Sequence, residues 1–98
     1  MGLKEAYQEK IEAQIKEWSA KIKELQAKAE GASADTKIEL QKRLQDLQAK
    51  KEAAQVKLKE LKATSADAWE KARPDLEKAL DNLKNAWEKV RKSFSEPR

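Results

Sequence analysis

Apolar side chains recur every three or four residues along the first third of the chain, which is the spacing of one face of an α-helix. Lys, Glu and Gln fill most of the positions between them. Heptad positions a and d are both apolar in this stretch, so the pattern predicts a coiled-coil helix. The run consists of Tyr7, Ile11, Ile15, Trp18, Ile22, Leu25 and Ala29.

Two further runs with the same period follow. Thr64 and Ser65 lie between them and offer N-cap side chains, so we expect a turn at residues 64–65 and a helix over residues 66–94. Pro74 lies inside the last run and predicts a kink, a locally broken turn or a helix that restarts there. The second run is Leu40, Leu44, Leu47, Ala54, Leu58 and Leu61, and the third is Trp69, Ala72, Leu76, Ala79 or Leu80, Leu83, Ala86 or Trp87, Val90 and Phe94.

The first and second runs are out of register by one residue, and the segment between them starts with Gly31. A glycine there can end a helix, and the sequence Thr36-Lys37-Ile38-Glu39 fits a capping box that opens another. One glycine costs only about 1 kcal/mol inside a helix, so an unbroken helix is also compatible. We favour a long coiled-coil helical hairpin with a first helix over residues 3–63, and keep an antiparallel three-helix bundle with an extra turn at 31–35 as the alternative.

Composition supports an all-α fold in a single domain over residues 1–98. Charged residues make up 41% of the chain, against about 25% in an average domain, and the chain has only two glycines and two prolines. The chain contains no cysteine and no histidine, which removes thiolate chemistry, Ser/His/Asp triads and the usual zinc ligands. We therefore expect no enzyme activity and no catalytic, cofactor-binding or metal-binding residues. Without a long apolar stretch, the expectation is a soluble, cytoplasmic protein.

Several short motifs resemble a small bacterial family of coiled-coil-domain or stress-response proteins. The most specific are Ser65-Ala66-Asp67-Ala68-Trp69-Glu70, Ala86-Trp87 and Trp18-Ser19-Ala20-Lys21-Ile22. The resemblance extends over nearly the whole chain and implies a helical hairpin, a role in the stress response and no catalytic residues. At Gly31-Ala32-Ser33 the chain departs from the family, which usually continues there with helix-forming residues.

Two functions follow from this pattern. The first is a structural or interaction protein that forms a homo-oligomer, most simply a dimer, or binds another coiled-coil protein. The second is an amphipathic-helix protein that binds a membrane or lipid surface. Nucleic acid is a disfavoured partner, because Glu52 and Glu60 interrupt the only concentration of lysines. The residues expected to mediate packing or association are Ile11, Ile15, Trp18, Ile22, Leu25, Trp69 and Trp87.

Overall fold

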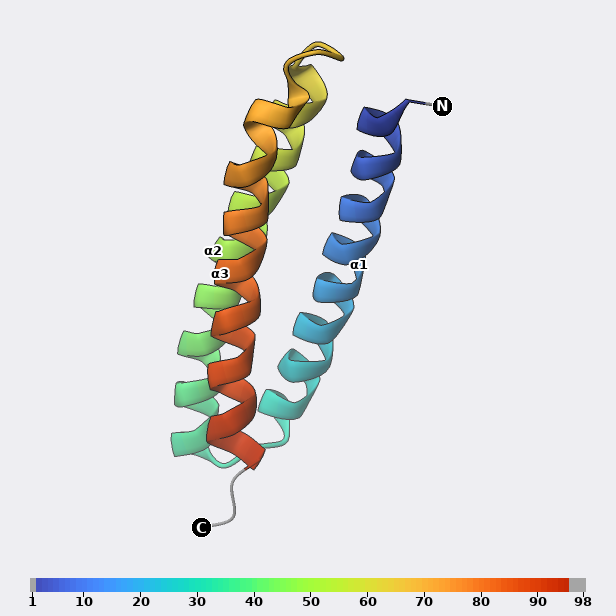
Figure 1. The fold of residues 1–98 in the computed structure, drawn as a ribbon. Helices are drawn as coiled ribbons and strands as arrows, with labels where there is room; N and C mark the ends of the chain where they lie inside the picture. The colour runs from blue at the N-terminus through green and yellow to red at the C-terminus, as the bar shows by residue number, and fades with distance from the viewer. Residues whose placement is uncertain (1, 96–98) are drawn as a thin grey trace.

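The computed structural model describes residues 2–95, with side chains up to Lys92. It consists of three helices joined by two turns (Figure 1). The chain passes along the bundle three times in alternating directions, as α1 (Leu3–Glu30), α2 (Ala34–Ala63) and α3 (Trp69–Ser95). The bundle measures 51 × 19 × 18 Å, close to the length of its 30-residue helix at about 1.5 Å per residue. The predicted all-α fold is confirmed. The side chain of Phe94 lies outside the described residues.

A short turn separates α1 from α2, so the chain has the three-helix arrangement rather than one helix over residues 3–63. The N–H groups of Gly31 and Ala32 bond three residues back, to the carbonyls of Lys28 and Ala29, which tightens the last turn of α1. Ser33 has an extended backbone, and its carbonyl accepts a hydrogen bond from the N–H of Lys37. The helix α2 therefore begins at Ala34, and the predicted capping box at Thr36 is wrong. Turning here lets α1 fold back and bury its apolar face.

The second turn closes α2 and α3 into a helical hairpin, as predicted at Thr64 and Ser65. The Thr64 hydroxyl donates to the carbonyl of Leu61 at 2.6 Å, and the Lys4 ammonium on α1 donates to the carbonyls of Lys62 and Thr64. These bonds satisfy carbonyls that a helix end leaves without partners. The turn extends to residue 68, so α3 begins three residues later than predicted.

Pro74 does not interrupt α3. The proline is the sixth residue of that helix, and helical structure continues on both sides of it. Its ring removes the backbone hydrogen bond from residue 74 to the carbonyl of Glu70, and the helix continues without that one bond. The prediction of a broken turn or a restart at Pro74 is therefore wrong.

The core divides into two apolar clusters, one at each end of the bundle, and no polar or charged residue in the described part of the chain is buried. Lys51 marks the division: it occupies a heptad a position between Leu47 and Ala54 and is half-buried. The cluster near the 64–68 turn contains Tyr7, Ile11, Ile15, Ala54, Leu58, Leu61, Trp69, Leu76 and Ala79. The cluster near the 31–33 turn contains Ile22, Leu25, Ala29, Leu40, Leu44, Leu47, Leu83, Ala86 and Val90.

Candidate interaction grooves

The apolar face of α1 that the sequence assigned to association lies inside the bundle. Ile11 and Ile22 are 2% and 1% exposed, and Ile15 and Leu25 are also buried. A second copy is not needed to cover this face, because α2 and α3 cover it. A dimer that pairs through these residues of α1 is therefore incompatible with this fold. Self-association itself stays a prediction, and it has to use another surface.

The three tryptophans pack between helices, but to different depths. Trp69 is buried, whereas Trp18 on α1 and Trp87 on α3 are half-buried at the edge of the core near the 31–33 turn. Their ring centroids lie 5.9 Å apart with an angle of 70° between the planes, which is a favourable edge-to-face arrangement. The Lys21 ammonium lies 4.7 Å from the Trp18 ring centroid, within the range of a cation–π contact.

A second aromatic contact joins α1 to α3 at the opposite end. The rings of Tyr7 and Trp69 lie 5.5 Å apart. The Tyr7 hydroxyl donates to Glu77 Oε1 at 3.3 Å, and Arg73 Nε donates to the same oxygen at 2.9 Å. Burial and the nearby carboxylate raise the pKa of Tyr7, and the hydrogen bond from Arg73 lowers the pKa of Glu77. Sequence reasoning placed Tyr7 in the apolar run but missed this polar group.

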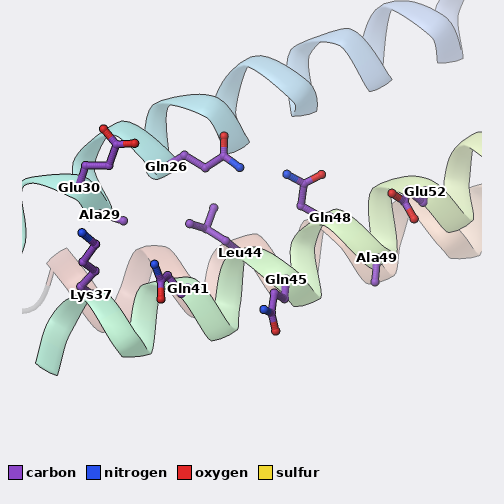
Figure 2. Close-up of a pocket in the computed structure, with 10 residues that line it drawn as sticks. All are labelled: Gln26, Ala29, Glu30, Lys37, Gln41, Leu44, Gln45, Gln48, Ala49 and Glu52. Carbon is purple, nitrogen blue, oxygen red and sulfur yellow. The ribbon is translucent and has the colours of Figure 1, made fainter. Parts of the chain in front are cut away.

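The surface between α1 and α2, on the side away from α3, forms an open groove of about 830 Å³ (Figure 2). Leu44 and Ala29, which belong to the buried core, form its apolar floor, and Figure 2 shows the amide ends of Gln26 and Gln48 turned into the space between the helices. We call this the glutamine groove. Its full lining is Gln26, Ala29, Glu30, Lys37, Gln41, Leu44, Gln45, Gln48, Ala49 and Glu52.

The sequence pattern did not predict the glutamine groove, because glutamine was interpreted only as a residue of solvent-exposed helix positions. A signal was present, since Gln41 and Gln48 are seven residues apart and Gln45 is four residues after Gln41. That spacing places them on one side of α2. Long, uncharged amides that both donate and accept hydrogen bonds differ from the Lys and Glu residues that cover most of this molecule.

A second groove of about 460 Å³ lies between α2 and α3 and is much more charged. Four of its lining residues are basic, namely Lys42, Arg43, Lys50 and Lys89, and two are acidic, namely Glu39 and Asp46. Two asparagines of α3, Asn82 and Asn85, complete the polar lining with Ala86 and Val90 beside them. We call this the basic groove.

Comparison with family models, with curated proteins and with solved structures found no match to this chain. The resemblance to the coiled-coil stress-response family stays a prediction. Within residues 2–95, no helix has both the length and the apolar character that crossing a membrane requires. Over the same residues, no group of three or more acidic side chains is placed to hold a metal ion. The two grooves are therefore the features from which a function is inferred.

Proposed function

We propose that this protein is a non-enzymatic helical interaction protein that binds a helix of a partner in the glutamine groove. The observation that supports this proposal is the groove itself, an open channel between two helices of 28 and 30 residues. A helix laid along such a channel completes a four-helix arrangement, in which apolar and small side chains of each helix pack against its neighbours.

The lining residues suit a helical partner. Ala49 is exposed and has a small side chain that permits close approach of a second backbone, and the buried side chains of Ala29 and Leu44 form an apolar floor beneath it. The glutamines reorient easily and both donate and accept hydrogen bonds, so they can pair with polar side chains on either side of a partner's apolar stripe. The partner is either a second copy of this chain or another helical protein, and the role in the stress response rests on the family resemblance alone.

A matched pair of variants tests the glutamine groove. Ala49 lines it, whereas Ala53 is exposed one turn further along α2 and lines neither groove. Ala49→Arg places a long cation in the groove, and Ala53→Arg makes the same change outside it. Both sites are exposed and helical, so neither substitution disturbs the core.

The measurement is photo-crosslinking in cells with a photoreactive residue at Gln45, on the groove edge. We expect a protein adduct that Ala49→Arg abolishes and Ala53→Arg preserves. A photoreactive residue at Glu60, exposed on α2 but outside both grooves, provides the background. Adducts of equal yield at positions 45 and 60, or an adduct indifferent to Ala49→Arg, would contradict the proposal.

A lipid surface is the second candidate, favoured by the partly exposed pair of Trp18 and Trp87 with the Lys21 ammonium beside it. Tryptophan and lysine together are favoured where a membrane meets water. Vesicles that contain phosphatidylglycerol test this candidate through the tryptophan emission. A blue shift that Trp18→Phe and Trp87→Phe reduce would support it, and unchanged emission at saturating lipid would exclude it.

A further inference from the structure

The charge of the molecule is unevenly divided among its helices. Six basic and six acidic residues balance on α1, whereas α2 carries eight basic against five acidic and α3 carries seven against five. The net positive charge therefore belongs to the hairpin of α2 and α3, and the basic groove is the surface that these two helices share.

The cations in the basic groove are not equally engaged. The Lys50 ammonium forms an ion pair with Asp46 at 2.5 Å, so these two charges largely cancel. Lys42, Arg43 and Lys89 form no ion pair with any residue in the described part of the chain, and Glu39 is the one remaining acid in the lining. Three cations thus face one anion.

Arg43 is the central group of this set. It is half-buried, and its Nε atom is covered by neighbouring atoms without a hydrogen-bond acceptor among the residues that the structure describes. A covered donor without a partner is unfavourable, so Arg43 gains a hydrogen bond when its side chain turns to meet an incoming acceptor. The planar guanidinium matches a carboxylate with two parallel hydrogen bonds, which a lysine ammonium does not provide.

We propose that the basic groove binds an acidic peptide segment of a partner protein, with a carboxylate on Arg43 and flanking acids near Lys42 and Lys89. The asparagines favour a peptide over other anions. Asn82 and Asn85, three residues apart on α3, line the groove with side-chain amides that can pair with the N–H and C=O groups of a peptide backbone. Glu39 and Asp46 break the positive surface into separate spots, which suits spaced carboxylates better than the continuous phosphates of a nucleic acid or an anionic membrane.

This site lies outside the glutamine groove and goes beyond the function proposed above. The test is fluorescence anisotropy of a labelled twelve-residue peptide rich in Asp and Glu, titrated with the intact protein. A peptide of the same length rich in Asn and Gln serves as the uncharged reference. We expect saturable binding of the acidic peptide that weakens between about 0.05 M and about 0.15 M salt, because screening grows over that range.

Variants distinguish the groove from general attraction to a positive protein. Arg43→Gln combined with Lys89→Gln should weaken binding by about tenfold, and Arg43→Lys should weaken it less, since it keeps the charge and loses the planar fork. The matched control is Lys23→Gln with Lys28→Gln, which removes the same two charges from exposed positions on α1. Circular dichroism confirms that each variant is folded, and Lys89→Gln alone, at an exposed site, provides a change that does not involve Arg43.

Three outcomes would overturn this inference. The first is an equal loss of binding in the α1 control, which would mean that only net charge matters. The second is saturable binding of the uncharged peptide with the same affinity. The third is a groove-dependent affinity for a DNA duplex or for phosphatidylglycerol vesicles that exceeds the affinity for the acidic peptide. The variants of this test, at Arg43 and Lys89, lie outside the glutamine groove, so this test and that of the glutamine groove can fail independently.

Discussion

The two ends of the bundle are held together by different kinds of contact. At the end near the 64–68 turn, aromatic rings lie in the core and polar groups link one helix to another. Tyr7 bonds to Glu77, Lys62 forms an ion pair with Glu12, and Lys4 bonds to the end of α2. At the end near the 31–33 turn, the core is mostly aliphatic, and no ion pair between helices occurs there among the described residues.

Chain connectivity does not account for this difference, because each end of the bundle has one turn and one helix end that no turn joins to a neighbour. α1 begins beside the 64–68 turn, and α3 ends beside the 31–33 turn (Figure 1). Such helix ends fray unless side chains hold them. The start of α1 is held by polar links and by the Tyr7–Trp69 contact, whereas the last part of α3 is held by apolar burial and by the Trp18–Trp87 contact. The same task is therefore met by two different kinds of side-chain contact.

The largest loss of stability is expected from Ile15→Lys combined with Ile22→Lys, which places one charge in each of the two apolar core clusters. Both side chains are buried, at 6% and 1% exposure, and an unpaired buried charge is among the most destabilising changes known. We expect α1 to detach and the helical signal to fall, as measured by circular dichroism and hydrogen exchange. Retention of a folded chain with only a change in oligomeric state would instead favour an extended dimer.

Replacing tryptophans compares the two ends directly. Trp69→Ala removes a ring that is 7% exposed and should cost about 3–5 kcal/mol. Trp87→Ala removes a half-buried ring and should cost clearly less. Thermal unfolding measures both, since 1 kcal/mol shifts the midpoint of a domain of this size by about 4–8 °C. Equal shifts would show that the two aromatic contacts are equivalent and would remove the contrast between the ends.

A smaller change in stability, in the stabilising direction, is expected from a substitution at the 31–33 turn. Gly31 has φ −89°, which any residue adopts, and an added Cβ would meet only the Lys28 carbonyl oxygen at 3.9 Å. Gly31→Ala should therefore stabilise the protein by about 0.4–1 kcal/mol, because it restricts the unfolded chain. Urea unfolding measures the change, and light scattering should give the same mass for this variant as for the native protein. A larger mass for the variant alone would mean that alanine had joined α1 and α2 into one helix.

The smallest effect concerns pH. The hydrogen bond from Arg73 lowers the pKa of Glu77 below its ordinary value of 4.5, so the carboxylate stabilises the fold above pH 4.5. This contribution disappears as the pH falls through the lowered pKa. Glu77→Gln should accordingly lower the unfolding midpoint slightly at pH 7, and the difference from the native protein should vanish in acid. Because Glu77 is exposed, solvent screening keeps the effect small.

Periodicity was sufficient to predict much of this fold. The apolar runs identified the buried faces of all three helices, and Thr64 and Ser65 located the hairpin turn. The break after Glu30 could not be decided from local residues, because a single glycine is compatible with both a turn and a helix. What decides it is the burial of Ile11 through Leu25 against α2 and α3, which is a property of the whole chain.

The candidate sites were harder to predict than the fold. The heptad pattern indicates which residues face the core. It does not distinguish among the flanking positions, some of which line grooves while others face open solvent. The glutamine groove and the basic groove are both made of flanking residues, brought together from two helices far apart in the sequence. Arg43 illustrates the limit, since its sequence neighbours do not reveal that Lys89 and Asn85 line the same groove.

The central position of α2 has a consequence for how the protein folds. The close backbone approaches in the bundle join α1 to α2 and α2 to α3, each pair being consecutive in the chain, while α1 and α3 meet through long side chains. Each close pairing needs the closure of only one short loop, whose entropic cost is low. Proteins with such low contact order fold in microseconds to milliseconds. The contacts between α1 and α3, such as Tyr7 with Glu77 and Trp18 with Trp87, span the longest stretches of sequence, so we expect them to form last.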